Sequence, residues 1–247
     1  MRQRTYLPTL RQYYPFTPEE IRGLIVSILI TAFIVSFKEW GYRKFDIMVG
    51  LRNFFDAALI ITLVMVVFNS GQRMFGIFRG FKVEYKPWIY GLIIGLVLVF
   101  VSNGNIWFLA PGGIIVYHLA GHRLGYFRYG LNYGHLGWVG MMGPLSTLAL
   151  AIIAKVLVEF MPANVLVHKL MLIAIAFTVF NLIPIPPLAG SHLFYATRLG
   201  YMFCAGGILG ACLMLNYLPV AWVIPGMLLV AVASWLSFYV FFERNVQ

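Results

Sequence analysis

Two histidines four residues apart, His118 and His122, have the spacing of a pair that binds a metal ion. Four-residue spacing places both imidazoles on one face of either a helix or a strand, and neutral imidazole is an ordinary zinc ligand. A tetrahedral site needs further ligands, and His192 is the candidate for a third. Leu119 follows His118, so no carboxylate stands there to act as general base on a metal-bound water. We favour two interfacial histidines in a loop, and a zinc site built from the three histidines is the alternative.

A proline-rich stretch between two long apolar runs is the second candidate site. It reads Phe-Asn-Leu-Ile-Pro-Ile-Pro-Pro-Leu-Ala-Gly-Ser from Phe180 to Ser191. Proline has no N–H donor and clashes with the preceding helical turn, so a helix cannot continue through it. Non-helical backbone at membrane depth persists only where protein buries it or where it lines a polar cavity. We therefore expect this proline seam, defined as residues 181–190, to lie among packed helices. Its candidate cavity residues are Asn181, Pro184, Pro186, Pro187 and Gly190.

The seam resembles the N-x-x-P-x-P-P-L-D-G segment of the site-2 protease family, the intramembrane zinc metalloproteases. In that family the Asp is a zinc ligand, and Ala189 stands at its position here. Gly143-Pro144-Leu145 is similar to the family's G-P-L helix start, and the segment from Arg79 to Tyr85 is similar to one in compact archaeal members. The resemblance covers about residues 21–200 and implies a site-2-protease-like core at about 54–200.

The family's catalytic helix carries H-E-x-x-H, in which two histidines bind zinc and the Glu is the general base. In the register that we favour, Asn69, Ser70 and Arg73 stand at the positions of the first His, the Glu and the second His. Arginine cannot deprotonate in a protein, so it cannot ligate zinc. The alternative register places the motif at His118 and His122. Both registers lack the Glu, and the resemblance therefore implies a family member that is degenerate at its catalytic motifs.

Arg73 would be a buried cation in this register, at a cost of about 2.5–3.5 kcal/mol unless it is paired or reaches the headgroups. The prolines of the seam free carbonyl acceptors, and a guanidinium offers five N–H donors. We expect Arg73 and Asn69 to hydrogen-bond the backbone of residues 183–189. The alternative is an Arg73 that marks a helix end and points to the headgroups.

Apolar runs of about 20 residues, the length that crosses a bilayer core, must position these sites. They lie at about 21–37, 54–68, 88–101, 139–160, 165–183, 191–215 and 220–242. The sequence thus predicts an all-α, multi-pass integral membrane protein with six or seven transmembrane helices. Residues 1–20 form a basic and aromatic N-terminal arm, and residues 21–247 form a single transmembrane domain. At their junction Thr17-Pro18-Glu19-Glu20 predicts a helix start, with Thr17 as the N-cap.

Two segments depart from the helical period. Arg79–Lys86 is expected to be a charged turn or a short strand. Apolar residues then alternate with polar residues and glycine at Phe127, Tyr129, Leu131 and Tyr133. A period of two is typical of a strand, so we expect a small interfacial β-hairpin there, with the aromatic face toward lipid or over the cavity.

Composition places the chain among membrane proteins and against nucleic-acid binders. Of its 247 residues 61% are hydrophobic and 11% charged, and its mean hydropathy is +0.86. The Lys and Arg residues that give the net charge of +10 lie mostly near the ends of the apolar runs, where anionic lipid attracts them. They flank both ends of the early runs, so the sequence does not determine orientation. Cys204 and Cys212 lie in one apolar run and are expected to be packing residues.

We expect a non-catalytic, site-2-protease-like membrane protein without a cofactor. It would bind transmembrane segments or act as a subunit of a membrane complex, with membrane lipid as its other partner. One alternative is an active intramembrane metalloprotease whose zinc is held by a rearranged His118/His122 site. A second is a lipid-binding or transport protein built on the same seam.

Overall fold

The computed structural model describes residues 3–41, 45–119 and 133–244. Most of these residues are helical, and they include a two-stranded sheet. The elements in chain order are α1 (Gln3–Tyr13), α2 (Pro18–Ser36), the 3-10 turn η1 (Phe37–Glu39), α3 (Ile47–Phe78), β1 (Phe81–Pro87), α4 (Ile89–Val101), β2 (Gly112–His118), α5 (Tyr133–Phe160), α6 (Val165–Asn181), α7 (Ala189–Ala196), α8 (Arg198–Tyr217), α9 (Val220–Phe238) and the π-helical turn η2 (Tyr239–Glu243).

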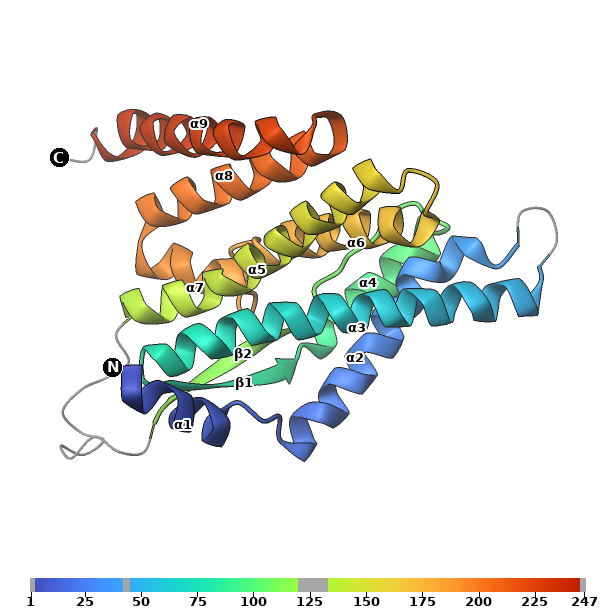
Figure 1. The fold of residues 1–247 in the computed structure, drawn as a ribbon, viewed down its shortest axis with the longest axis horizontal. Coiled ribbons are helices and arrows are strands. Elements are labelled where there is room, and N and C mark those ends of the chain that lie inside the picture. The colour runs from blue at the N-terminus through green and yellow to red at the C-terminus, as the bar shows by residue number, and fades with distance from the viewer. Residues whose placement is uncertain (1–2, 42–44, 120–132, 245–247) are drawn as a thin grey trace.

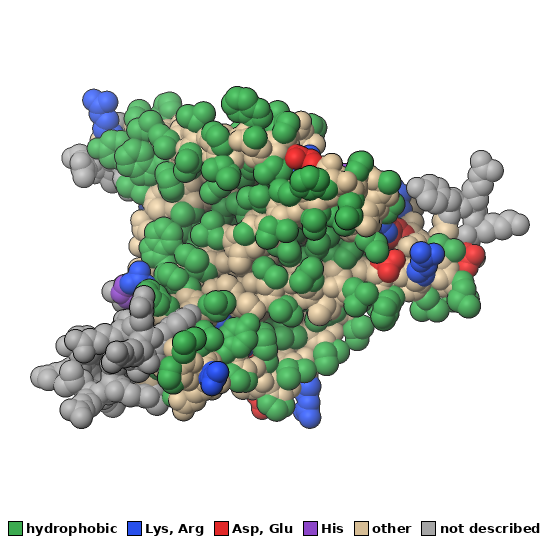
Figure 2. All heavy atoms as spheres, viewed as in Figure 1, with side chains coloured by type: hydrophobic (Ala, Val, Ile, Leu, Met, Phe, Trp, Pro, Cys, Tyr) green, Lys and Arg blue, Asp and Glu red, His purple; other side chains and the backbone are tan. Residues whose placement is uncertain are grey.

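Five helices are long and apolar enough to cross a membrane: α2, α3, α5, α8 and α9. Two shorter apolar helices, α4 and α6, lie with them. Figure 2 shows hydrophobic side chains over most of one face, with charged side chains toward its edges. The predicted helical class is therefore confirmed, and among the described residues five helices, against the six or seven expected, are long and apolar enough to cross a membrane. The chain is described below as a membrane protein.

The start of α2 matches its sequence signal. Thr17 is the N-cap and its hydroxyl accepts a bond from the Glu20 N–H, while Glu20 Oε2 accepts from the Thr17 N–H at 2.8 Å. This reciprocal pair is a capping box, which satisfies two N–H groups that a helix start leaves open. The predicted start at Thr17 and Pro18 is confirmed.

Successive long helices run in opposite directions, so the bundle has two distinct ends. At one end the start of α2 meets the sheet, where Gly23 lies against Pro87. At the other, the turn after α2 meets the turn after α4, and Lys38 donates to Asn105 at 2.7 Å. Both chain termini lie on the same side of the bundle (Figure 1). We call the end with the start of α2 and the end of α9 the terminal end.

β1 pairs antiparallel with β2, from Phe81 opposite His118 to Pro87 opposite Gly112. Of the two alternatives expected at 79–86, a charged turn or a short strand, the structure shows the strand, which begins at Phe81. Its partner is a segment some 30 residues later, and the two strands enclose α4 in the chain. The hairpin expected at Phe127, Tyr129 and Leu131 lies outside the described residues. Tyr133, the last residue of that pattern, begins α5.

The predicted single apolar run at 191–215 is wrong, because two helices occupy it. α7 ends at Ala196, and Thr197 caps a new helix by accepting a bond from the Gly200 N–H at 3.2 Å. Both cysteines lie on α8, more than two turns apart, and both are free thiols.

Candidate functional site: the polar positions of α3 and the proline seam

Arg73 lies on the last two turns of α3 and is buried, with 2% of its surface exposed. Its guanidinium forms an ion pair with Glu20 of α2, which is 5% exposed. Arg73 also donates to the carbonyls of Tyr14 at 3.0 Å and Pro15 at 3.4 Å. The Phe16 ring stacks on the guanidinium, with 4.0 Å from its centroid to Cζ. The charge, the planar face and both terminal nitrogens of Arg73 are therefore used in contacts within the chain.

Glu20 holds three elements together. One carboxylate oxygen caps α2, and the other accepts from Arg73 and from the backbone N–H of Tyr85 in β1 at 2.7 Å. The Tyr85 hydroxyl in turn donates toward Ser27 of α2 at 2.8 Å or the Pro111 carbonyl at 3.1 Å. Burial raises the pKa of the Tyr85 phenol, so this hydroxyl stays a donor. The Glu20–Arg73 pair joins α2, α3 and the sheet at the terminal end.

The expectation that Arg73 braces the seam is wrong, and so is the alternative that it reaches the headgroups. All its bonds given above go to residues 14–20, and it is buried. The physical reason is charge: a buried guanidinium gains more from a carboxylate than from neutral carbonyls. Asn69 is also buried, and its side chain donates to its own helix at the Met65 carbonyl, 2.8 Å away. Ser70 bonds the Tyr14 hydroxyl at 2.7 Å.

Sequence reasoning missed Glu20, because its place in the first turn of α2 already explained it as a capping residue. The signal that could have identified Glu20 was the presence of Arg73 in an apolar helix. A guanidinium in an apolar helix needs a carboxylate partner, and the sequence has only eight acidic residues from which to choose.

Residues other than Arg73 donate hydrogen bonds to the carbonyls of the seam and its surroundings. Tyr201 of α8 donates its hydroxyl to the Leu182 carbonyl at 2.7 Å. Asn181 donates its amide to the carbonyls of Phe177 at 2.8 Å and of Leu109 at 3.1 Å, the latter in the segment before β2. These neutral contacts tie the seam to α8 and to the strand side of the molecule.

Close backbone packing fixes the seam further. A Cβ on Gly113 of β2 would lie 2.1 Å from the Pro187 carbonyl oxygen, and one on Gly190 would lie 1.9 Å from the Leu182 carbonyl oxygen. Neither distance leaves room for a side chain, so both glycines are required by contact with backbone. Of the predicted cavity residues, Pro187 and Gly190 therefore lie at a tight junction of β2, the seam and α7.

α5 lies between the polar positions of α3 and Ala189. The Gln72 side chain donates to the Gly140 carbonyl of α5 at 3.0 Å. On the α7 side, a Cβ on Gly140 would lie 2.9 Å from the Ala189 carbonyl oxygen and 3.0 Å from a ring carbon of His192. Arg73, one residue after Gln72, faces α2 instead.

The structure describes two of the three histidines of the alternative zinc site. His118 ends β2, where its ring lies 5.2 Å from that of Phe81, and His192 lies on α7 beside Gly140. The Nε2 atoms of both rings are buried without a hydrogen-bond partner in the described part of the chain. His122 lies outside the described residues. Among the residues that are described, no three His, Cys, Asp or Glu side chains group closely enough to hold a metal ion.

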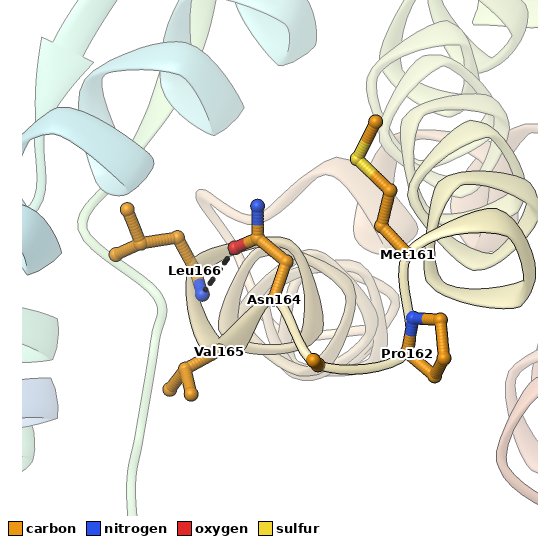
Figure 3. A pocket seen from close by; sticks show the side chains of 6 residues that line it. Met161, Pro162, Asn164, Val165 and Leu166 are labelled. Atoms are coloured by element: carbon orange, nitrogen blue, oxygen red, sulfur yellow. Dashed lines mark hydrogen bonds between the residues drawn. The ribbon is translucent and has the colours of Figure 1, made fainter.

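A shallow depression lies at the α5–α6 turn, away from these residues (Figure 3). It is lined by Met161, Pro162, Ala163, Asn164, Val165 and Leu166. The Asn164 side chain caps α6 by accepting from the Leu166 N–H at 3.1 Å. A capping residue among apolar neighbours supplies no chemistry.

In comparisons with known proteins, no family model, no curated protein and no solved structure matches this chain.

Proposed function

We propose that this chain is a non-catalytic, site-2-protease-like membrane protein that binds transmembrane segments of a partner, as a receptor or as a subunit of a membrane complex. The observation that carries the proposal is the set of structural contacts that Arg73 makes. At the position where the family motif has its second histidine, the chain has a cation neutralised by Glu20 and bonded to two carbonyls. A residue committed to structure in this way cannot serve zinc chemistry.

The exposed tip of the seam supports the binding role. Ile185 is 51% exposed and Pro186 is exposed as well, although the backbone here is not helical. The Ile183 N–H bonds the Phe180 carbonyl, and the N–H groups of Ile185 and Leu188 bond carbonyls within the seam. Within the described residues, the carbonyls of Pro184, Pro186 and Pro187 receive no hydrogen bond. The Pro187 carbonyl is covered by Gly113. Unpaired carbonyls in a membrane are costly unless protein covers them, and an unwound partner segment would supply cover and donors to the carbonyls of Pro184 and Pro186.

A crosslinking experiment tests the binding role. A photoreactive benzoylphenylalanine replaces Ile185 in one variant and Leu213, an exposed residue of α8 at 65%, in the control. Irradiation of native membranes should join position 185 to one discrete protein through its transmembrane segment, whereas position 213 should give only lipid adducts. Identical adducts from both positions would refute the binding role.

Elemental analysis tests the non-catalytic part separately. Purified protein in mild detergent should contain far less than one zinc per chain. One zinc per chain that disappears in His118→Ala would favour the metalloprotease alternative instead.

A further inference from the structure

The segment Tyr14–Phe16, called here the arm segment, contacts α3 in the manner of a bound peptide. It lies between α1 and the N-cap of α2 and belongs to no helix or strand. Its inner side meets buried Arg73, whereas Pro15 on its outer side is exposed. Arg73 is thus covered by a single layer of chain.

Three kinds of contact hold the arm segment, and each corresponds to one feature of a peptide. Arg73 bonds two successive main-chain carbonyls, those of Tyr14 and Pro15, which any extended peptide presents. The Ser70 hydroxyl meets the Tyr14 hydroxyl at 2.7 Å. The guanidinium packs on the Phe16 ring, a contact that requires an aromatic residue. Pro15 restricts the residue before it to extended conformations, which aligns the two carbonyls.

We propose that the Ser70–Arg73 face of α3 is a binding site for an extended aromatic-Pro-aromatic peptide, and that Tyr14–Phe16 occupies it as an intramolecular ligand. This site lies on the α2 side of α3, apart from the seam, so the proposal stands independently of the seam's proposed role. Tethering keeps the arm segment at a high effective concentration. A peptide from another chain therefore binds only when it competes successfully with the arm segment.

The ion pair explains why the site persists when the arm segment leaves. Glu20 holds the Arg73 charge in place and also bonds β1 through the Tyr85 N–H. These contacts belong to α2, α3 and the sheet and do not involve Tyr14–Phe16. Displacement of the arm segment would uncover a guanidinium that is already oriented.

The test uses the full chain with a weakened arm, Tyr14→Ala together with Phe16→Ala. The probe is a fluorescein-labelled peptide, Gln-Tyr-Tyr-Pro-Phe-Thr, which copies residues 12–17. The weakened chain should bind the probe saturably and at least tenfold more tightly than the wild-type chain does. Equal binding by the two chains would overturn the proposal.

A double substitution cycle locates the peptide. Ser70→Ala in the weakened chain should reduce affinity about fivefold for the probe, the usual effect of one neutral hydrogen bond. It should leave unchanged the affinity for a second probe with Phe in place of the tyrosine that matches Tyr14. Equal losses for both probes would place the peptide elsewhere and reject the assignment.

A measurement on the wild-type chain remains decisive even where the weakened chain does not fold. Hydrogen–deuterium exchange of residues 13–17 should accelerate when unlabelled probe is added in excess, because the probe displaces the tethered copy. Exchange that stays constant at millimolar probe would mean that the arm segment is a fixed part of the fold.

Discussion

Replacement of Glu20 by Gln should destabilise the protein by about 3–5 kcal/mol, the usual cost of leaving one partner of a buried ion pair without the other. The carboxylate accepts bonds from the Thr17 N–H, the Tyr85 N–H and the Arg73 guanidinium. A Gln side chain has one carbonyl oxygen, and its amide would turn an N–H donor toward at least one of these donors. Loss of one neutral hydrogen bond costs only about 1 kcal/mol. The uncompensated charge of Arg73 therefore dominates.

Equilibrium unfolding in mixed micelles, with a denaturing detergent added to a mild one and helicity followed by circular dichroism, measures this loss. Glu39→Gln is the matched control, because Glu39 pairs with Lys169 at 2.6 Å but is 35% exposed. Exposed pairs contribute about 0–1 kcal/mol. Glu20→Gln and Arg73→Met should also be non-additive, with a coupling energy of about 2–3 kcal/mol. A loss for Glu20→Gln no larger than that for Glu39→Gln, or an additive pair, would refute the reasoning.

Three further outcomes follow from the packing, the seam and the charge distribution. Gly190→Ala should cost about 3 kcal/mol or more in the same unfolding assay, because its Cβ would meet the Leu182 carbonyl oxygen at 1.9 Å. Gly226→Ala, whose Cβ meets only the flexible Met214 side chain, should change stability by less than about 1 kcal/mol; equal effects would contradict the seam geometry. Tyr201→Phe should cost about 1–3 kcal/mol by leaving the Leu182 carbonyl unpaired, whereas Tyr217→Phe, 84% exposed, should cost nothing measurable. The terminal end should face the cytoplasm by the excess of positive residues there, so an impermeant maleimide added to intact cells should label Asn105→Cys and not Gln12→Cys, and the reverse result would invert the topology. Among described residues outside the buried pair, eight basic residues lie toward the terminal end and four toward the other: Arg4, Arg11, Arg22, Arg79, Lys82, Lys86, Arg198 and Arg244 against Lys38, Arg52, Lys155 and Lys169.

Local signals predicted most of the helices. The capping box at Thr17 is complete within four residues, so its sequence alone determined where α2 begins. Apolar runs predicted the positions of the long helices, because hydrophobicity over 20 residues is a property of each segment alone. The break at Thr197 was missed, because only Thr197 and Arg198 interrupt the apolar pattern there, for less than one helical turn.

Non-local pairings could not be predicted. The charged residues of β1 indicated a turn or a strand there. Its partner strand, Gly112–His118, is mostly apolar and lies beyond α4 in the chain. Register between distant strands depends on packing that no local pattern contains. The same holds for Arg73 and Glu20, which are 53 residues apart. From the sequence we can infer that a buried guanidinium needs an anionic partner. Which carboxylate pairs with it depends on the tertiary fold.

The length of α3 has a consequence for how the protein sits in its bilayer. Its 32 residues extend about 48 Å at 1.5 Å per residue, against a hydrocarbon thickness of about 30 Å. The helix must tilt or protrude to relieve this hydrophobic mismatch. Arg73 lies five residues before the end of α3, so the protein layer formed by α2, the sheet and residues 14–16 surrounds it near that end of the helix. A thicker bilayer would bring acyl chains alongside this end of α3, whereas a thinner one would bring headgroups and water there, so the acyl-chain length of the host membrane sets the surroundings of the protein layer that covers the ion pair.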